Sequence, residues 1–281
     1  MSDPLPLADA AIAALDAGSI DDAAVVVLAT PDPIEKARAS RAAAQAWRDG
    51  TLGIAARPAK PPRRPGRLDE PALLEPAAMP RRKAGGLKGR IALLHALAHI
   101  ELNAVNLAWD MVARFGPILA ARDFYNDWVR VGDDEARHFL MLSDRLSDLG
   151  SRYGALPAHD GLWEAAEATA EDVLARLAVV PMVLEARGLD VCPDMIDKLE
   201  DAGDPDSASL LRIIYRDEIE HVKIGFSWFS QLCGTREQPM KDTWQALVRQ
   251  HFRGSLKPPF NEVARDQAGF PRAFYQTWGG G

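Results

Sequence analysis

Two stretches decide the fold of this chain: Asp-Glu-Ala-Arg-His at residues 134–138 and Asp-Glu-Ile-Glu-His at residues 217–221. Each contains a Glu-x-x-His unit, and residues three apart on an α-helix project from the same face. Each stretch therefore places one carboxylate and one imidazole side by side on a predicted helix. The repetition of the preceding aspartate indicates that the whole five-residue unit is duplicated.

A lone glutamate precedes each unit at almost the same distance. The chain has 34 residues from Glu101 to Glu135 and 33 from Glu185 to Glu218. The midpoints fall beside Gly116-Pro117 and within residues 201–205, where glycine and proline predict turns. Helices that fold back there and rise about 1.5 Å per residue bring each lone glutamate level with its Glu-x-x-His partner. The sequence thus predicts two helical hairpins.

The combined set has the composition of a dinuclear metal site. One Glu from each of two helices and Glu-x-x-His from each of two others is the ligand pattern of di-iron and di-manganese four-helix bundles. Four ionised glutamates in an apolar bundle would be costly without partners, whereas two divalent cations neutralise them. The predicted metal ligands are Glu101, Glu135, His138, Glu185, Glu218 and His221. The alternative, a metal-free bundle with these acids on its surface, is less favoured because apolar residues surround both lone glutamates.

Asp134 and Asp217 directly precede the two Glu-x-x-His units. A metal-bound histidine usually donates its other ring N–H to a carboxylate or carbonyl, which fixes the ring orientation. We therefore expect these two aspartates to support His138 and His221.

The predicted fold is all-α, a four-helix bundle with extra N-terminal and C-terminal helices. Four segments are expected: a helical cap at 1–56, a proline-rich and basic connector at 57–88, the bundle at 89–235, and a C-terminal helix and tail at 236–281. The bundle helices are expected at about 88–115, 118–149, 162–189 and 207–232, with short helices at 195–201 and 243–252. Pro181 should kink the third bundle helix, and Cys192-Pro193 should end it.

Composition limits the class of protein. The net charge of −7 gives no broad attraction to nucleic acid, and the basic connector is read as a solvated arm packed along the bundle or against a partner subunit. The two cysteines, Cys192 and Cys233, form no CxxC motif, which favours a reducing compartment. No uncharged apolar run approaches the roughly 20 residues that span a bilayer, so we expect a soluble, cytoplasmic protein with no membrane contact.

Several other polar and aromatic residues are expected to be structural. His95 and His99 have a spacing that could hold a metal, but on a helix they point away from Glu101, so hydrogen bonding or exposure is the favoured interpretation. His159 and His251 are assigned no role. Tyr125, Tyr215 and Trp128 are expected in the core, with proximity to the metals as the alternative.

Longer matches carry a resemblance to a known family. They are His-Ile-Glu at 99–101, Phe-Tyr-Asn-Asp-Trp at 124–128, Glu-Ala-Arg-His at 135–138, Pro-Ala-His at 157–159, the segment 180–190, and Asp-Glu-Ile-Glu-His-Val at 217–222. Through these stretches, residues 94–233 resemble the ferritin-like family catalogued as domain of unknown function 455. The resemblance implies a ferritin-like bundle and the ligand set above, but no reaction.

The wider ferritin-like superfamily, which this family resembles, suggests the function. Similar sites there activate O₂ at two reduced irons, so the leading expectation is a di-iron oxidoreductase, a hydroxylase or oxygenase acting on an unidentified small or RNA-borne substrate. Hydroxylases that modify tRNA are the nearest analogy. Manganese or a mixed iron–manganese pair is an alternative cofactor, and an electron donor protein and a homodimer are the expected partners. The other hypotheses are an iron-binding, ferroxidase or metal-delivery protein, and a structural bundle with a closed metal site.

Overall fold

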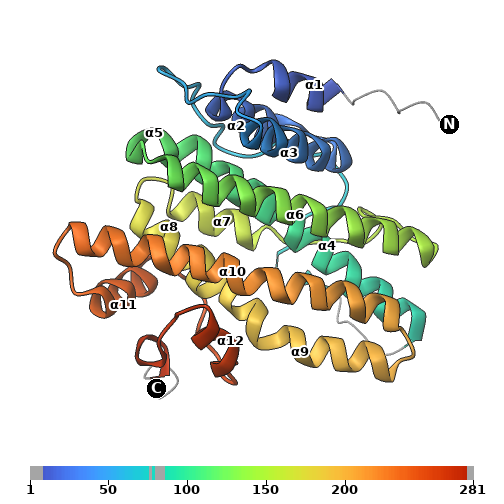
Figure 1. Ribbon diagram of the computed structural model, residues 1–281. Helices are drawn as coiled ribbons and strands as arrows, with labels where there is room; N and C mark the ends of the chain where they lie inside the picture. Colours follow the sequence, from blue (N-terminus) through green and yellow to red (C-terminus); the bar gives the residue numbers. More distant parts are fainter. Residues whose placement is uncertain (1–8, 76–77, 80–85, 277–281) are drawn as a thin grey trace. The chain divides into compact units, whose positions relative to one another are not determined.

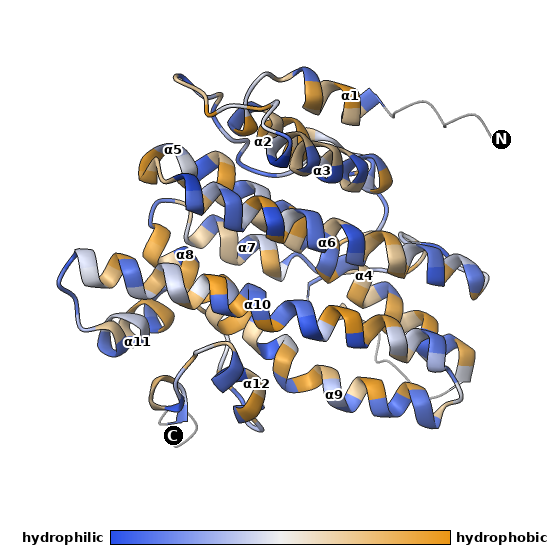
Figure 2. Ribbon diagram, viewed as in Figure 1, coloured by the Kyte–Doolittle hydropathy of each residue, from blue (hydrophilic) through white to orange (hydrophobic). Residues whose placement is uncertain are grey.

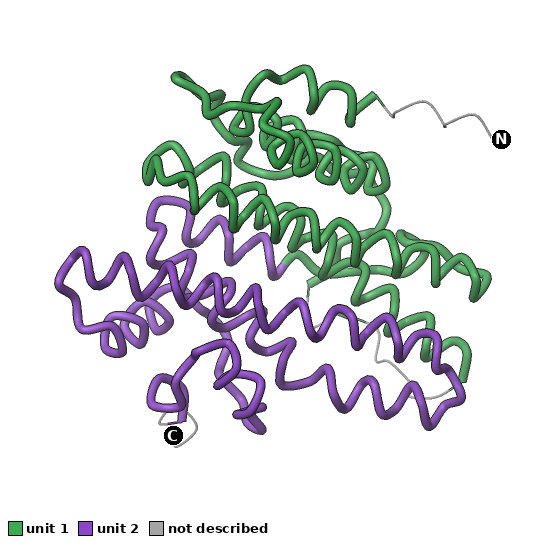
Figure 3. The backbone as a smooth tube through the Cα atoms, viewed as in Figure 1, with its two compact units in different colours: residues 1–160 green, residues 161–281 purple. Residues whose placement is uncertain are grey.

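A computed structural model describes residues 9–75, 78–79 and 86–276. Within these residues the protein is all-α, and the extended backbone pairs only at isolated bridges, as between Ser19 and Gly53. The chain divides into unit 1, residues 1–160, and unit 2, residues 161–281 (Figure 3). The predicted all-α class is confirmed, and each unit contains one of the two predicted hairpins.

Unit 1 begins with three helices, α1 (Asp9–Asp16), α2 (Ile20–Ala29) and α3 (Pro33–Arg48) (Figure 1). Side chains cap two of them. The hydroxyl of Ser19 accepts from the backbone N–H of Asp22, and the carboxylate of Asp32 accepts from the N–H groups of Ile34 and Glu35. These caps satisfy N–H groups that the first helical turn leaves free. These three helices lie within the segment 1–56 for which a helical cap was predicted, of which residues 1–8 lie outside the described residues.

The hairpin of unit 1 consists of α4 (Gly86–Asp110) and α6 (Arg122–Asp148). The π-helix η2 (Met111–Phe115) and the short helix α5 (Gly116–Leu119) form the turn, which ends with Ala120 in the left-handed region at φ 48°. Polar and apolar residues alternate along α6 at helical spacing (Figure 2), and its apolar face packs against α4. The predicted first hairpin is therefore present.

A buried chain of hydrogen bonds joins α3, α4 and α6. The indole N–H of Trp109 donates to the hydroxyl of Ser40 at 2.7 Å, and that hydroxyl donates to the carbonyl oxygen of Gly132 at 2.7 Å. A Cβ on Gly132 would lie 2.7 Å from the indole nitrogen, so only glycine permits this approach. The three helices pack closely where Gly132 leaves this space.

The connector packs along unit 1. The N–H of Gly66 donates to Leu28 O at 2.8 Å, and the N–H of Leu74 donates to Ala158 O at 2.8 Å. These bonds join the connector to α2 and to the loop after α6, while residues 80–85 of the predicted basic connector lie outside the described residues. The helix α4 begins at Gly86, slightly before the predicted end of the connector.

Unit 2 contains α7 (Gly161–Ala168), α8 (Val173–Val179), the π-helix η3 (Val180–Glu185), α9 (Ala186–Asp201) and α10 (Pro205–Thr235). The turn at residues 202–204 folds α10 back along α9, as predicted. A Cβ on Gly225 of α10 would lie 2.3 Å from the Cβ of Pro181 in η3. Because Gly225 has no Cβ, α10 can pack directly against η3.

The predicted helix end at Cys192-Pro193 is wrong, because α9 continues through Pro193 to Asp201. Proline removes one backbone hydrogen bond, but the buried stripe of α9 extends on both sides of it, through Leu189, Cys192, Ile196 and Leu199. The burial of that stripe outweighs the tendency of proline to end a helix. At Pro181 the α-helix is interrupted, and the interruption is a π-helical segment.

Beyond α10, unit 2 ends with α11 (Met240–His251), α12 (Glu262–Gln267) and the 3₁₀-helix η4 (Arg272–Phe274). The buried guanidinium of Arg265 pairs with Asp190 of α9 at 2.8 Å and lies over the rings of Phe260 and Tyr275. This ion pair and the ring contacts attach the C-terminal segment to α9.

One helical stretch, Gly86–Leu119, is long and apolar enough to cross a membrane by length and composition. Of its most apolar window, 56% is buried inside the protein, as is usual for the core helix of a soluble protein. One helix of this length and composition is only weak evidence of a membrane span.

Candidate metal centre

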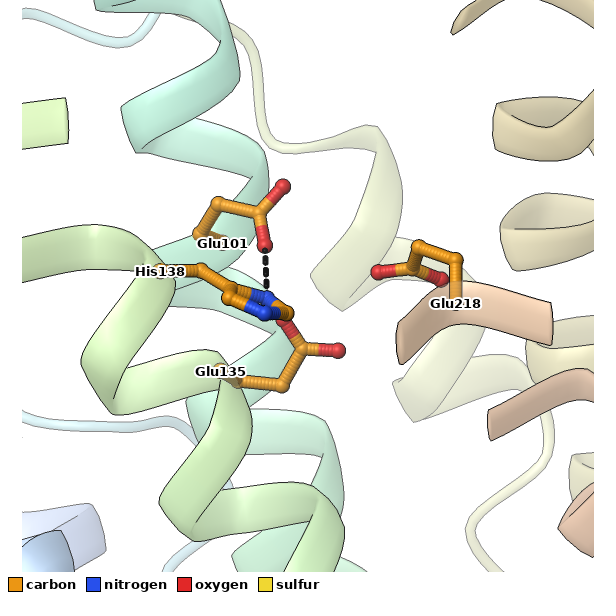
Figure 4. Close-up of side chains that lie close together, drawn as sticks. All are labelled: Glu101, Glu135, His138 and Glu218. Carbon is orange, nitrogen blue, oxygen red and sulfur yellow. Dashed lines mark hydrogen bonds and ion pairs between the residues drawn. The ribbon is translucent and has the colours of Figure 1, made fainter. Parts of the chain in front are cut away.

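Three of the predicted ligands meet in unit 1. Glu101 projects from α4, and Glu135 and His138 project from α6 (Figure 4, which also draws Glu218 of unit 2). The Nδ1 atom of His138 lies 3.2 Å from Oε2 of Glu101 and 3.4 Å from Oε2 of Glu135. The hairpin therefore brings two carboxylates to one imidazole nitrogen, as the spacing predicted.

This cluster is almost completely removed from solvent. Glu101 is 3% exposed, and Glu135 and His138 are 0% exposed. Burial, and next the negative charge of Glu135, raise the pKa of Glu101 well above its usual value, while the hydrogen bond from His138 acts in the opposite direction. Without a cation, Glu101 therefore favours its protonated form. A bound cation would reverse this preference by stabilising both carboxylates.

The three side chains fit a metal ion. Glutamate oxygens and histidine nitrogens bind divalent metals at about 2.0–2.2 Å, so neighbouring ligand atoms of one ion lie about 3.0–3.5 Å apart. The two distances from Nδ1 of His138, 3.2 and 3.4 Å, fall in that range. Mixed carboxylate and imidazole donors suit iron, manganese and zinc, so the donor set alone does not select one metal.

The other predicted ligands lie in unit 2. On α10, Nδ1 of His221 is 3.8 Å from Oε1 of Glu218, and the imidazole is 1% exposed. Glu185 is the last residue of η3, which packs against α10. The carboxylate–imidazole pair predicted for this hairpin is present. The role of Glu185 as a ligand remains a prediction.

The two supporting aspartates contact arginines. Asp134 pairs with Arg137 at 3.0 Å and with Arg130 at 3.9 Å, and Asp217 pairs with Arg216 at 3.2 Å. Their predicted interaction with the two histidines remains a prediction.

His95 and His99 have hydrogen-bonding roles, as expected. His95 accepts at Nε2 from the backbone N–H of Gly154 at 2.9 Å, and Nδ1 of His99 lies 2.8 Å from the hydroxyl of Tyr153. The ring of Tyr153 stacks on both imidazoles. These contacts hold the loop after α6 against α4.

Of the three aromatic residues singled out in the sequence, Tyr125 and Trp128 lie in the core as expected, whereas Tyr215 is only partly buried. Tyr125 is buried and donates to Asp21 at 2.7 Å, and Trp128 is 1% exposed. Tyr215 accepts a hydrogen bond from Asn261 at 2.8 Å. Cys192 and Cys233 are both buried free thiols.

Lys36 of α3, which is 1% exposed, is one of several buried charged residues that sequence reasoning missed. Its ammonium donates to Asn106 on α4 at 2.7 Å. A signal was present in the sequence, because Lys36 shares helical spacing with Ser40, Ala43 and Trp47, a buried and mostly apolar stripe. A lysine on such a stripe indicates either an exposed tip or a buried charge with a specific partner.

The fold and the site define an all-α protein with a buried carboxylate–imidazole cluster that could hold a metal ion. The chain belongs to the family described as "Protein of unknown function (DUF455)", whose model matches residues 29–276. The match includes α3, the connector and both hairpins. The resemblance noted from the sequence is thereby confirmed at the level of this family.

A relative from Haemophilus influenzae (strain ATCC 51907 / DSM 11121 / KW20 / Rd), which carries the name "Uncharacterized protein", is 41% identical over 207 residues. The alignment covers 72% of this chain and 72% of the relative. No solved structure matches the chain.

Proposed function

We propose that this chain is a dinuclear-metal oxidoreductase with a ferritin-like four-helix bundle. Each hairpin contributes a half-site, which is one lone glutamate and one Glu-x-x-His pair, and the two half-sites jointly bind two metal ions. The observation that carries the proposal is the buried cluster of Glu101, Glu135 and His138. In this cluster Nδ1 of His138 lies 3.2 Å from a carboxylate oxygen of Glu101 and 3.4 Å from one of Glu135. The repeated unit in α10, with His221 beside Glu218, supports a second metal position.

The negative charge of the two buried carboxylates favours a metal site over a cluster with a purely structural role. Two carboxylates in a fully buried position cost several kcal/mol unless they are paired or protonated. Only one ring nitrogen of His138, Nδ1, faces the two carboxylates, so the imidazole can donate one proton between them. A divalent cation compensates both negative charges. The proposed ligands are Glu101, Glu135, His138, Glu185, Glu218 and His221, with at least one glutamate bridging the metals and Asp134 and Asp217 orienting the histidines.

We propose iron as the metal, with manganese or a mixed pair as the alternative, and an O₂-dependent hydroxylation or oxygenation as the reaction. Two reduced irons would supply the electrons and the open positions for O₂ activation. The protein contributes the fixed carboxylates and the exclusion of water by the apolar residues around α4 and α6. An electron donor protein and an organic substrate are required, and a cytoplasmic location fits the two free thiols.

The first experiment measures metal content after purification without chelator, and the optical spectrum after anaerobic reduction and exposure to O₂. We expect about two irons per chain, as the ligand pattern implies, and an O₂-dependent absorption band. Glu101→Gln should lose most of the bound metal. Glu220→Gln is the matched control, because Glu220 lies on α10 between two proposed ligands but is partly exposed and pairs with Lys223.

The outcomes separate the alternatives. Metal that oxidises once, without turnover when a reductant is added, would favour a ferroxidase or metal-delivery protein. Bound metal without any response to O₂ would favour the closed structural site. Equal metal content in Glu101→Gln and the native protein would refute the ligand assignment.

A further inference from the structure

A cavity of about 50 Å³ lies inside unit 1, away from the metal ligands. Its walls come from the start of α3, the connector at 64–73, one face of α4 and the loop after α6. On α4 the lining residues are His99, Leu102, Asn103 and Asn106. Glu101 projects from the opposite side of the helix, because each residue turns the helix by about 100°.

A buried cation forms one wall of the cavity. The ammonium of Lys36 donates to Leu28 O at 3.2 Å, to Gly66 O at 3.0 Å and to Asn106 Oδ1 at 2.7 Å. All three acceptors are neutral, and no carboxylate of the described residues pairs with this ammonium. Burial lowers the pKa of Lys36 to about 7. In its protonated form, which predominates below about pH 7, Lys36 is a positive charge with hydrogen-bond partners but without a counterion.

The amide of Asn106 provides an oriented donor next to this charge. An ammonium can only donate, so the atom facing Lys36 must be the oxygen, and the NH₂ group points elsewhere. Asn106 is 5% exposed and lines the cavity, and its NH₂ group has no acceptor among the described residues. A ligand oxygen in the cavity would give this NH₂ group an acceptor.

Arg67 adds a second cation to the lining. Its guanidinium donates to the carbonyl oxygens of Pro71 at 2.5 Å and Asp69 at 3.5 Å, and it pairs with no carboxylate in the described part of the chain. The two acids of the lining are engaged elsewhere: Glu70 pairs with Arg152, and Asp160 pairs with Arg64. The lining therefore leaves Lys36 and Arg67 as positive charges that carboxylates do not neutralise.

We propose that this cavity binds a compact oxyanion, a phosphate or a carboxylate group, between Asn106 and Arg67. The amide NH₂ of Asn106 and the guanidinium of Arg67 donate to its oxygens. Lys36 has all three of its protons engaged, so it acts as the buried positive charge and as the group that orients the amide. The volume is several times the roughly 10–15 Å³ that one water molecule needs, which suits an anion of a few heavy atoms.

The test is calorimetric titration of the native protein with inorganic phosphate and, separately, with acetate, at constant ionic strength set with chloride. We expect at least one of the two to bind with saturation. Binding of phosphate alone assigns a phosphate group, and binding of acetate alone assigns a carboxylate. Absence of saturable binding of both would overturn the proposal.

Asn106→Asp is the decisive variant. It is nearly isosteric, it gives Lys36 a carboxylate partner, and it removes the NH₂ donor, so it should fold and should lose the oxyanion. Arg67→Gln should weaken binding by about tenfold or more, the usual effect of losing one charge-assisted hydrogen bond. Arg41→Gln is the control, since Arg41 is exposed on α3 and pairs with Asp133.

Phosphate could also bind to metals, and Glu101→Gln separates the two sites. Binding that persists in Glu101→Gln and is lost in Asn106→Asp would support the cavity. Binding that is lost in Glu101→Gln and persists in Asn106→Asp would place the anion at the metals and overturn the proposal.

Discussion

Lys36 and Glu101 are ionisable side chains of opposite sign, both buried in unit 1, and burial shifts the pKa of each toward its neutral form. Their partners differ in kind. Glu101 meets a second carboxylate and a single imidazole, so its surroundings hold more potential negative charge than positive charge. Lys36 meets only neutral oxygens, so its surroundings lack negative charge. One position is suited to a cation and the other to an anion.

The lowered pKa of Lys36 predicts a specific pH dependence of stability. Between the folded pKa of about 7 and the ordinary lysine pKa of 10.5, the unfolded chain binds a proton that the folded chain releases. The free energy of unfolding should therefore rise with pH in this window, by about 2 kcal/mol from about pH 7 to about pH 9. Below the folded pKa both states are protonated, and this contribution becomes constant.

Denaturant unfolding in phosphate-free buffer checks this prediction. Lys36→Met should remove the rise, because methionine does not titrate. Lys198→Met should keep it, since Lys198 is exposed and pairs with Asp194. If Lys36→Met and the native protein showed the same change of stability with pH, Lys36 would not be the titrating group.

At the scale of the elements, the sequence predicts the helices well because their buried stripes are long and regular. The stripes of α6 and α10 carry the Glu-x-x-His units, so the ligand pairs of the half-sites were also predictable. The extent of α9 was not predictable from the sequence. Whether the helix breaks or continues at Pro193 depends on what α9 packs against. The π-helical turns η2 and η3 leave no local periodic signal.

The fit between α10 and η3 can be tested through Gly225. An added Cβ would lie 2.3 Å from Pro181, a rigid residue that cannot rotate away. Gly225→Ala should therefore destabilise the protein by about 1–3 kcal/mol through overpacking. Because η3 ends at the proposed ligand Glu185, we also expect weaker metal binding.

Gly234→Ala is the matched control on the same helix, where an added Cβ meets nothing within 4 Å. Alanine favours the helix more than glycine does, so this variant should be as stable as the native protein or slightly more stable. Thermal unfolding of both variants measures the difference. A Gly225→Ala protein as stable as Gly234→Ala would contradict the close packing of α10 on η3.

At the scale of the whole molecule, sequence reasoning reaches the carboxylate–imidazole cluster but not the cavity. The proposed ligands follow from spacing within a helix and from two short turns. The cavity brings Lys36, Arg67 and Asn106 together from α3, the connector and α4, and no periodic pattern relates them. Such positions depend on how the connector packs, which has no sequence period.

The proposed metal pair makes a prediction that involves both units. If the half-sites share two metals, adding iron to the metal-free protein under anaerobic conditions should slow amide hydrogen exchange in α4 and α6 of unit 1 and in α10 of unit 2. Binding to the folded state alone stabilises it by about 2.7 kcal/mol at a hundredfold excess over the dissociation constant, so the slowing should be large in the most protected amides.

Variants of one half-site then report on the other. Glu101→Gln, with its substitution in unit 1, should lose the iron-dependent protection of α10 as well as that of α4, because a shared pair of metals needs ligands from both hairpins. Glu220→Gln should retain both effects. Protection confined to α4 and α6 in the native protein would mean that the unit 1 cluster binds metal by itself, and the dinuclear proposal would then fail while the single-metal site remained.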